Sequence, residues 1–201
     1  MKIVGITGPT GAGKSALSEY LRGRGIPVID ADALYHSLLI PPSPCLDALR
    51  NAFGEEIFSP EGMLDRKKLA NIVFGDKNKL ELLNKTVLDF VLNRARQILR
   101  EYEAEGIAIA AIDAPTLIES GFHTECHTVV SVICPSKLRI ERIILRDNIE
   151  KEAAEARVHG QKSDGFYISH SDRIIQNDSS ESDFLEECRS FADSLLTGDI
   201  L

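Results

Sequence analysis

The chain begins with Met1-Lys2-Ile3-Val4-Gly5-Ile6-Thr7-Gly8-Pro9-Thr10-Gly11-Ala12-Gly13-Lys14-Ser15, in which an apolar segment runs into the pattern Gly-x-x-x-x-Gly-Lys-Ser. The residues that follow, with Leu17 and Leu21 four positions apart, are typical of an amphipathic helix. A strand, a glycine-rich loop and a helix in this order form a phosphate-binding loop. The sequence therefore predicts that the chain binds a nucleoside triphosphate near its N-terminal end.

Each part of this loop has a chemical role in holding phosphate. Glycine has no Cβ, so backbone N–H groups can turn inward around an anion, and the helix adds the positive end of its dipole. Lys14 supplies charge to the β- and γ-phosphates, while the Ser15 hydroxyl can coordinate Mg²⁺. The alternative is an ordinary glycine-rich turn, which the flanking strand and helix disfavour. We expect nucleotide contacts from Gly8, Gly11, Ala12, Gly13, Lys14, Ser15 and Ala16.

Length and composition restrict the class of protein further. The 201 residues suffice for one domain with a small insertion, and the net charge of −8 argues against a nucleic-acid scaffold. No stretch approaches the roughly 20 apolar residues that span a bilayer. The cysteines lack the C-x-x-C spacing of zinc or redox sites; they are Cys45, Cys126, Cys134 and Cys188. We therefore expect a cytoplasmic protein that binds neither nucleic acid nor membrane and holds no structural metal.

Strand-like and helix-like segments alternate along the chain, as in α/β proteins. The expected strands are Ile3–Thr7, Pro27–Ile29, Ile107–Ile112, Thr128–Cys134 and Arg173–Gln176. Those at 107–112 and 128–134 are apolar on both faces, which is typical of a parallel sheet covered by helices. The pattern predicts an α/β fold of the P-loop NTPase type, with a doubly wound parallel five-stranded sheet.

The expected helices show where the chain departs from simple alternation. They are Lys14–Arg24, Ala33–Leu39, Pro44–Phe53, Arg66–Phe74, Lys77–Glu103, Ser136–Arg146 with Ser136 as its N-cap, Glu150–His159 and Asp183–Leu196. Between the second and third strands there are only helical patterns. We therefore divide the single domain into a core of 1–32, 105–135 and 170–201 and a helical insertion of about 33–104 on the substrate side.

Three acidic residues follow strands of this predicted sheet, where ligands of parallel α/β sheets gather. Asp30 and Asp32 close the second strand, and Asp113 closes the third. A carboxylate beside bound ATP can accept a proton from the attacking hydroxyl or orient Mg²⁺ through water. The alternative for Asp30 or Asp32 is an N-cap of the helix that begins near Ala33.

A basic cluster forms the second candidate constellation. Arg139, Arg142 and Arg146 lie at i, i+3 and i+7 of one expected helix and so share a face, with Arg157 in the next helical segment. Arginine suits bidentate contact with phosphate whose charge must be neutralised. The alternative is a solvated face paired with nearby acids. Because a phosphate loop is present, we favour phosphate contact by this cluster, and we expect Arg142 and Arg146 to be its main residues.

The separated motifs of the chain resemble those of the dephospho-coenzyme A kinase family over nearly the whole length. The phosphate loop is shared by many enzymes, whereas Asp30-Ala31-Asp32 after Pro27-Val28-Ile29 and Gly62-Met63-Leu64-Asp65-Arg66 are much more specific. Other similar segments are Phe53-Gly54, Ile72-Val73-Phe74, Asp113-Ala114-Pro115-Thr116-Leu117-Ile118-Glu119-Ser120-Gly121, Glu141-Arg142, Arg146-Asp147, Arg157 with Gln161, and Ser171-Asp172-Arg173-Ile174-Ile175-Gln176-Asn177.

The resemblance implies a transferase of coenzyme A biosynthesis that moves the γ-phosphate of ATP to the ribose 3′-hydroxyl of dephospho-coenzyme A. It places ATP on the phosphate loop and Mg²⁺ at Ser15, and Asp113 matches the acid that assists the metal. Asp32 would accept the proton of the acceptor hydroxyl or orient it. Lys14 and Arg142 would neutralise the transferring phosphoryl group.

The resemblance also assigns parts around this centre. The helical insertion would cover the acceptor, and a segment of about 146–165 would act as a lid that keeps water from the γ-phosphate. Arg146 would contact the nucleotide from that lid, and Asn177 would contact it on the adenine side, the alternative for Asn177 being a turn residue. No sequence feature indicates the oligomeric state.

Several positions depart from the family pattern. Ala16 replaces a threonine, Thr116 replaces a leucine, and Leu88-Asp89 stands where a His-Pro pair is usual. A first alternative is therefore a divergent P-loop kinase for another nucleotide or a small alcohol. A second is a regulatory ATP-binding module; a GTP-dependent switch would need Asn-Lys-x-Asp, which Asn84-Lys85-Thr86-Val87 does not provide.

Overall fold

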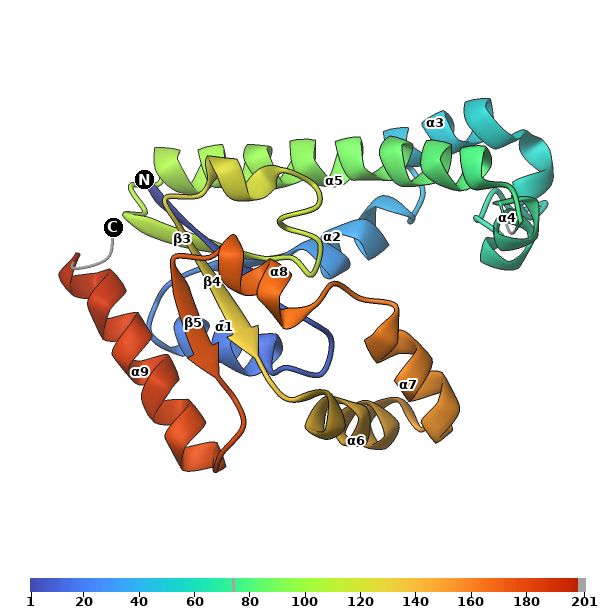
Figure 1. Cartoon of the computed structure of the whole chain (residues 1–201). Helices are drawn as coiled ribbons and strands as arrows, with labels where there is room; N and C mark the ends of the chain where they lie inside the picture. The colour runs from blue at the N-terminus through green and yellow to red at the C-terminus, as the bar shows by residue number, and fades with distance from the viewer. Residues whose placement is uncertain (74, 199–201) are drawn as a thin grey trace. The chain divides into compact units, whose positions relative to one another are not determined.

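In the computed structural model, which describes residues 1–73 and 75–198, five strands form one sheet in the order β2-β3-β1-β4-β5 (Figure 1). The strands are β1 (Lys2–Thr7), β2 (Val28–Asp30), β3 (Ile109–Asp113), β4 (Thr128–Ile133) and β5 (Arg173–Gln176). β1 pairs in parallel with β3 and β4, and β4 pairs in parallel with β5. The predicted α/β fold with a parallel five-stranded sheet is confirmed.

The helices fill the intervals between these strands. They are α1 (Lys14–Gly23), α2 (Ala31–Leu38), α3 (Pro44–Phe53), α4 (Arg66–Val73), α5 (Lys77–Ala104), α6 (Ser136–Asp147), α7 (Lys151–His159), α8 (Asp164–Ser169) and α9 (Glu181–Thr197), with 3-10 turns η1 (Glu55–Ile57) and η2 (Phe122–Glu125). No helix among the described residues is long and apolar enough to cross a bilayer.

Both faces of the sheet are covered, which explains why the central strands are mostly apolar. Val130 and Val132 of β4 share one buried cluster with α1 and α9. Ile133 belongs to another cluster, with Tyr167 of α8. Because successive strand side chains point to opposite faces, α1 and α9 cover one face near β4 and α8 covers the other. This double cover makes the sheet doubly wound.

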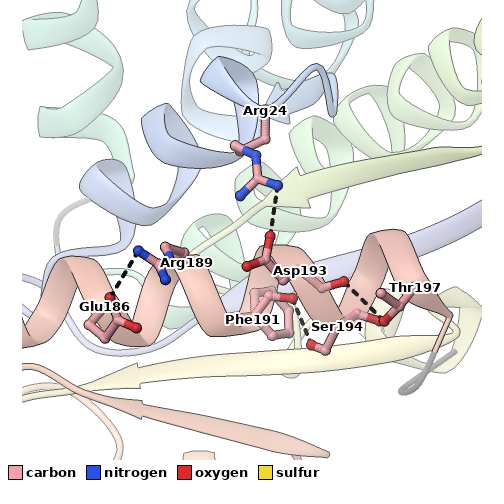
Figure 2. A network of polar contacts seen from close by, with 7 residues as sticks. All are labelled: Arg24, Glu186, Arg189, Phe191, Asp193, Ser194 and Thr197. Carbon is pink, nitrogen blue, oxygen red and sulfur yellow. Dashed lines mark hydrogen bonds and ion pairs between the residues drawn. The ribbon is translucent and has the colours of Figure 1, made fainter.

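Contact between α1 and α9 combines a buried core with a polar clasp at its edge. Leu21 of α1 and Phe191 of α9 are almost fully buried. Figure 2 shows Arg24, just after α1, reaching Asp193 of α9, with 2.7 Å between Nη2 and Oδ1. Ser194 donates to the Phe191 carbonyl at 2.7 Å along the same helix. Apolar burial holds this pair of helices, and the clasp marks its solvent edge.

The chain divides into two compact units, residues 1–29 with 102–201 and residues 30–101. The second unit is helical and has a core of its own, which includes Leu49 and Phe53 of α3, Leu69 of α4 and Val91 of α5. From Ala31 on, its described residues contain no strand, only an isolated bridge between Phe58 and Leu64. Between β2 and β3 the described residues therefore form the helices α2 to α5 and the turn η1, joined by loops.

Element ends differ from the predictions for local reasons. Ser136 is the first residue of α6 and not its N-cap, a position that Pro135 takes. α9 begins at Glu181 because Ser180 and Asp183 form a capping box there. β3 begins at Ile109 because the Ile107 N–H is used to close α5. The short α8 was not predicted.

Two predicted regions reach residues outside the described part of the chain. The helix expected at Arg66–Phe74 and the motif at 72–74 include Phe74, and the core segment 170–201 includes residues 199–201.

Candidate active site

Two glycines of the phosphate loop occupy positions that no other residue could take without strain. Gly8 has φ 130°, and a Cβ there would collide with the carbonyl oxygen of Val132 in β4. Gly13 has φ 113°, and a Cβ there would collide with the side-chain nitrogen of Asn177. Positive φ and close approach both require glycine. The loop is therefore shaped by its neighbours from β4 and the end of β5.

The start of α1 is built to receive an anion. Gly13 is its N-cap residue, and no side chain of the described residues caps the helix. The Gly13 carbonyl accepts from Ala16 N at 3.1 Å. Ser15 and Ala16 are exposed in this first turn. An exposed, uncapped helix N-terminus after a glycine loop combines N–H donors with the positive end of the dipole.

Lys14 lies over the loop that it follows. Its Nζ donates to the carbonyl oxygens of Gly8 at 2.8 Å and Pro9 at 3.1 Å. The ammonium group is therefore held beside the loop backbone, on the short path between strand and helix. A cation in this place can interact with the phosphates of a nucleotide bound to the loop.

Asn177 and Arg142 hold the loop from its carbonyl side. The Asn177 Nδ2 donates to the Ala12 carbonyl at 2.7 Å, and Arg142 Nη2 donates to Asn177 Oδ1 at 3.1 Å. Arg142 Nη1 is also 3.5 Å from the carbonyl oxygens of Gly11 and Ala12. In a trans peptide the carbonyl and the next N–H point in opposite directions. Fixing the Ala12 carbonyl therefore turns the Gly13 N–H away from these two side chains.

The contacts of Asn177 also explain its burial. The side chain is only 7% exposed, at the end of β5, and its backbone N–H donates to Ile133 O at 2.8 Å. Arg142 Nη1 lies 3.3 Å from the sulfur of the buried Cys134. Both predicted site residues are thus brought to the phosphate loop, and both are engaged with its backbone.

Asp113 ends β3 beside the central strand, in register with Ile6 of β1. Its Oδ2 accepts from the hydroxyl of Ser18 at 2.7 Å, and Ser18 is buried in the first turns of α1. The carboxylate is thus tied to the helix that carries Ser15. A hydroxyl and a carboxylate are hard oxygen ligands of the kind that Mg²⁺ takes from proteins.

The acids after β2 have different roles in the backbone. Asp30 is the N-cap of α2 and accepts from the Ala33 N–H at 2.9 Å. Asp32 lies within the first turn of α2 and is exposed. Asp30 therefore caps the helix, and the carboxylate of Asp32 takes no part in this cap. Both residues belong to the second unit.

The end of α6 carries an ion-pair cluster around Asp147. Its carboxylate accepts from Arg146 Nε at 2.7 Å and Arg157 Nη1 at 2.6 Å. The hydrogen bond from Arg146 and the two positive charges hold the pKa of Asp147 below its ordinary value. The next residue, Asn148, has φ 50° and separates α6 from α7. The chain thus places Arg146 and Arg157 side by side at this turn.

Gln161, after α7, contacts the phosphate loop directly. Its Oε1 accepts from the Thr10 N–H at 3.0 Å. From the sequence this glutamine is only part of a motif with Arg157, and no role is predicted for it. The contact joins a segment within the predicted lid to the outer turn of the loop, and the four-residue spacing from Arg157 was its only sequence signal.

Comparison with protein families and curated relatives points in one direction. The family model for dephospho-CoA kinase matches residues 2–183. A dephospho-CoA kinase of Symbiobacterium thermophilum is 36% identical over 177 residues, which are 88% of this chain and 74% of that protein. The dephospho-CoA kinase of Fusobacterium nucleatum subsp. nucleatum is 34% identical over 193 residues, 96% of this chain and 98% of that one.

Solved structures share the same architecture. The chain is similar to dephospho-CoA kinase from Campylobacter jejuni, with TM-score 0.74 and 27% identity, over 99% of this chain and 100% of that chain. TT1252 from Thermus thermophilus gives TM-score 0.81 and 28% identity over 97% of each chain. Shikimate kinase from Acinetobacter baumannii, with TM-score 0.53 and 16% identity over 100% and 96%, shares the fold.

Proposed function

The chain belongs to the dephospho-CoA kinase family, and we propose that its phosphate loop and the carboxylate of Asp32 together carry the transfer. The enzyme moves the γ-phosphate of ATP to the ribose 3′-hydroxyl of dephospho-CoA and releases CoA and ADP. The observation that supports these roles is a glycine loop fixed by its neighbours and followed by an uncapped helix N-terminus.

Within the loop we assign direct phosphate contact to the backbone N–H groups and to Lys14. The backbone contacts come from Gly8, Gly11, Ala12, Gly13, Lys14, Ser15 and Ala16. Lys14 neutralises charge that develops on the transferring group, an effect that is strongest in a site from which water is excluded. Arg146 contributes a second cation from the predicted lid.

Arg142 and Asn177 act through the loop in this proposal. Their hydrogen bonds to the Gly11 and Ala12 carbonyls favour a positioning role over direct contact with the phosphoryl group or the adenine. A pre-oriented N–H donor needs no reorganisation during the reaction. Arg142 therefore supports catalysis by keeping the donors in place.

Ser15 and Asp113 fit Mg²⁺ as hard oxygen ligands, Ser15 directly and Asp113 through water. The ion, when bound, would neutralise phosphate charge and orient the β- and γ-phosphates. The described residues contain no group of three or more His, Cys, Asp or Glu that could hold a metal. The chain therefore supplies few ligands, and phosphate oxygens and water complete the set.

Asp32 is the group we assign to the acceptor. Its exposed carboxylate, free of the capping role of Asp30, accepts the proton of the attacking hydroxyl or orients that hydroxyl. The helical segment of about 33–104 binds the acceptor, the segment of about 146–165 serves as the lid, and the core comprises 1–32, 105–135 and 170–201.

We also assign the enzyme to the cytoplasm, on the state of its thiols. All four cysteines are free, and three of them are buried. Burial raises the pKa of Cys126 from its ordinary value of 9.0 to about 12, aided by the charges of Glu125 and Asp172. Unpaired, protonated thiols suit a reducing compartment.

The deciding experiment is release of ADP from ATP and Mg²⁺, with dephospho-CoA, with adenosine nucleotides, and with no acceptor. We expect strong stimulation by dephospho-CoA alone and formation of CoA in equal amount. Equal stimulation by another acceptor would contradict this acceptor assignment, and rapid turnover without acceptor would make the protein an ATPase.

A further inference from the structure

Arg139 is a buried cation whose hydrogen bonds are incomplete. It lies in the first turn of α6 and is only 4% exposed. Its Nη2 donates to the Ser136 hydroxyl at 3.3 Å. Its Nε and Nη1 are shielded from solvent and have no hydrogen-bond partner among residues 1–73 and 75–198. Most of this guanidinium is therefore without a partner.

Such a group is costly to keep in a protein interior. Arginine remains charged at any physiological pH, so it cannot escape the cost by losing its proton. Buried charges in proteins are normally paired and hydrogen-bonded. Arg139 forms no ion pair with any carboxylate in the described part of the chain. An anion would satisfy these unpartnered N–H groups.

The position of Arg139 indicates which anion could serve. A Cβ added to Gly11 would lie 2.9 Å from the Arg139 carbonyl oxygen and 3.2 Å from its Cα and Cβ, so the residue touches the outer turn of the phosphate loop. The neighbouring loop residue, Thr10, is the one that Gln161 contacts. A nucleotide bound to this loop would bring its phosphate chain, an anion, close to the same turn.

The charge of Arg139 also affects a buried tyrosine of α8. Tyr167 of α8 is 2% exposed; burial raises the pKa of its hydroxyl, and the charge of Arg139 works against that rise. Arg139 thus lies beside the loop, and its charge reaches a helix that begins at the end of the predicted lid. A long, flexible side chain in this place can turn toward a ligand bound to the loop.

We propose that Arg139 is a further phosphate-binding residue, stored without a partner in the nucleotide-free enzyme and turned onto the terminal phosphate of ATP when nucleotide binds. This inference rests on the proposed function, since it needs ATP on the loop. The two arginines therefore have different roles: Arg139 binds the phosphate of the ligand, whereas Arg142 holds the backbone of the loop.

The test compares Arg139→Met with Lys137→Met. Methionine keeps much of the length of the side chain and removes its charge. Lys137, the control residue, is exposed and lies two residues before Arg139 on the same helix. For Arg139→Met we expect a higher midpoint of thermal unfolding without nucleotide, because an unpaired buried charge is removed. We also expect ATP affinity to fall about tenfold or more, the scale of a charge-assisted hydrogen bond, and ADP affinity to fall less. Lys137→Met should change neither quantity.

Unchanged ATP affinity in Arg139→Met would overturn the proposal, as would equal losses of ATP and ADP affinity. If the methionine variant does not fold, Arg139→Lys and Arg139→Gln provide the same comparison, with lysine expected to bind ATP more tightly than glutamine. Equal ATP affinity in those two variants would also overturn it. Failure of the proposed function is a separate result, because it would appear as the absence of dephospho-CoA-dependent CoA formation in the unaltered enzyme, whatever the ATP affinity of the variants.

Discussion

The phosphate loop and the start of α2 both carry proposed catalytic groups, but the chain supports them differently. The loop is bounded by buried side chains from β5 and α6, and Asn177 and Arg142 hold its carbonyls. Asp32 is exposed on a short helix, and the side chain that caps this helix belongs to Asp30. The loop depends on a network of hydrogen bonds, whereas the start of α2 contributes a single carboxylate to the proposed site.

This difference decides where function is sensitive to substitution. Changes around the loop act through the orientation of backbone donors, so residues that touch no substrate matter there. Around Asp32 we expect sensitivity at that residue and tolerance at its neighbours.

Replacement of Lys14 should have the largest effect. Lys14→Ala removes the charge beside the β- and γ-phosphates and should lower turnover on the order of a thousandfold or more. The measurement is CoA formation at saturating substrates, with Lys137→Ala as the control for loss of a surface lysine. Near-normal turnover in Lys14→Ala would refute the assignment of the nucleotide site.

Asp32→Asn should have the next largest effect and tests the independence of the α2 region. We expect turnover to fall roughly a hundredfold, the scale for loss of a general base, with ATP affinity nearly intact. The matched control is Asp30→Asn, which makes the same change two residues away and keeps an N-cap residue. If Asp32→Asn weakened ATP binding and left the rate unchanged, Asp32 would instead be a metal-linked or structural residue.

Asn177→Ala tests the loop network itself. Loss of the bond to the Ala12 carbonyl should weaken ATP and ADP alike by about tenfold, since both need the loop N–H groups. The preference for ATP over GTP should not change. Gln176→Ala, an exposed neighbour, is the control. A loss of base preference without a general loss of affinity would show instead that Asn177 contacts adenine.

The smallest effect is expected at the opposite end of α1, where polar contact is exposed. Arg24→Gln breaks the clasp to Asp193 shown in Figure 2 and should lower the midpoint of thermal unfolding only slightly. The difference should vanish in roughly 1 M salt, because exposed charges are screened. A large loss that persists in salt would show that this clasp, and not the buried core, holds α9 on α1.

Regular periodicity made most of the fold predictable from the sequence. The strands at 109–113 and 128–133 are mostly apolar, and glycine spacing together with Lys14 marks the phosphate loop. Element ends were less accurate because caps decide them locally, as Asp30 does for α2. The six residues of α8 are too few to show a helical period.

The site was predictable in its residues but less so in their contacts. Asn177 is far from the loop in the sequence, and only the sheet order brings it to Ala12. Likewise, spacing along α6 shows that Arg139, Arg142 and Arg146 share a face, but it cannot show which is buried. In the folded chain Arg139 is buried, Arg142 is hydrogen-bonded to the phosphate loop and Arg146 is paired with Asp147.

The bond between Ala12 and Asn177 joins residues 165 positions apart, and this governs when the enzyme can first bind ATP as it is made. β1 and its loop are synthesised before the sheet neighbours of β1, which begin at Ile109 and Thr128. Strand pairings this distant in sequence are slow to form. A nascent chain that has not reached Asn177 lacks the asparagine that fixes the loop, so the enzyme should acquire its affinity for nucleotide only after this residue has been synthesised.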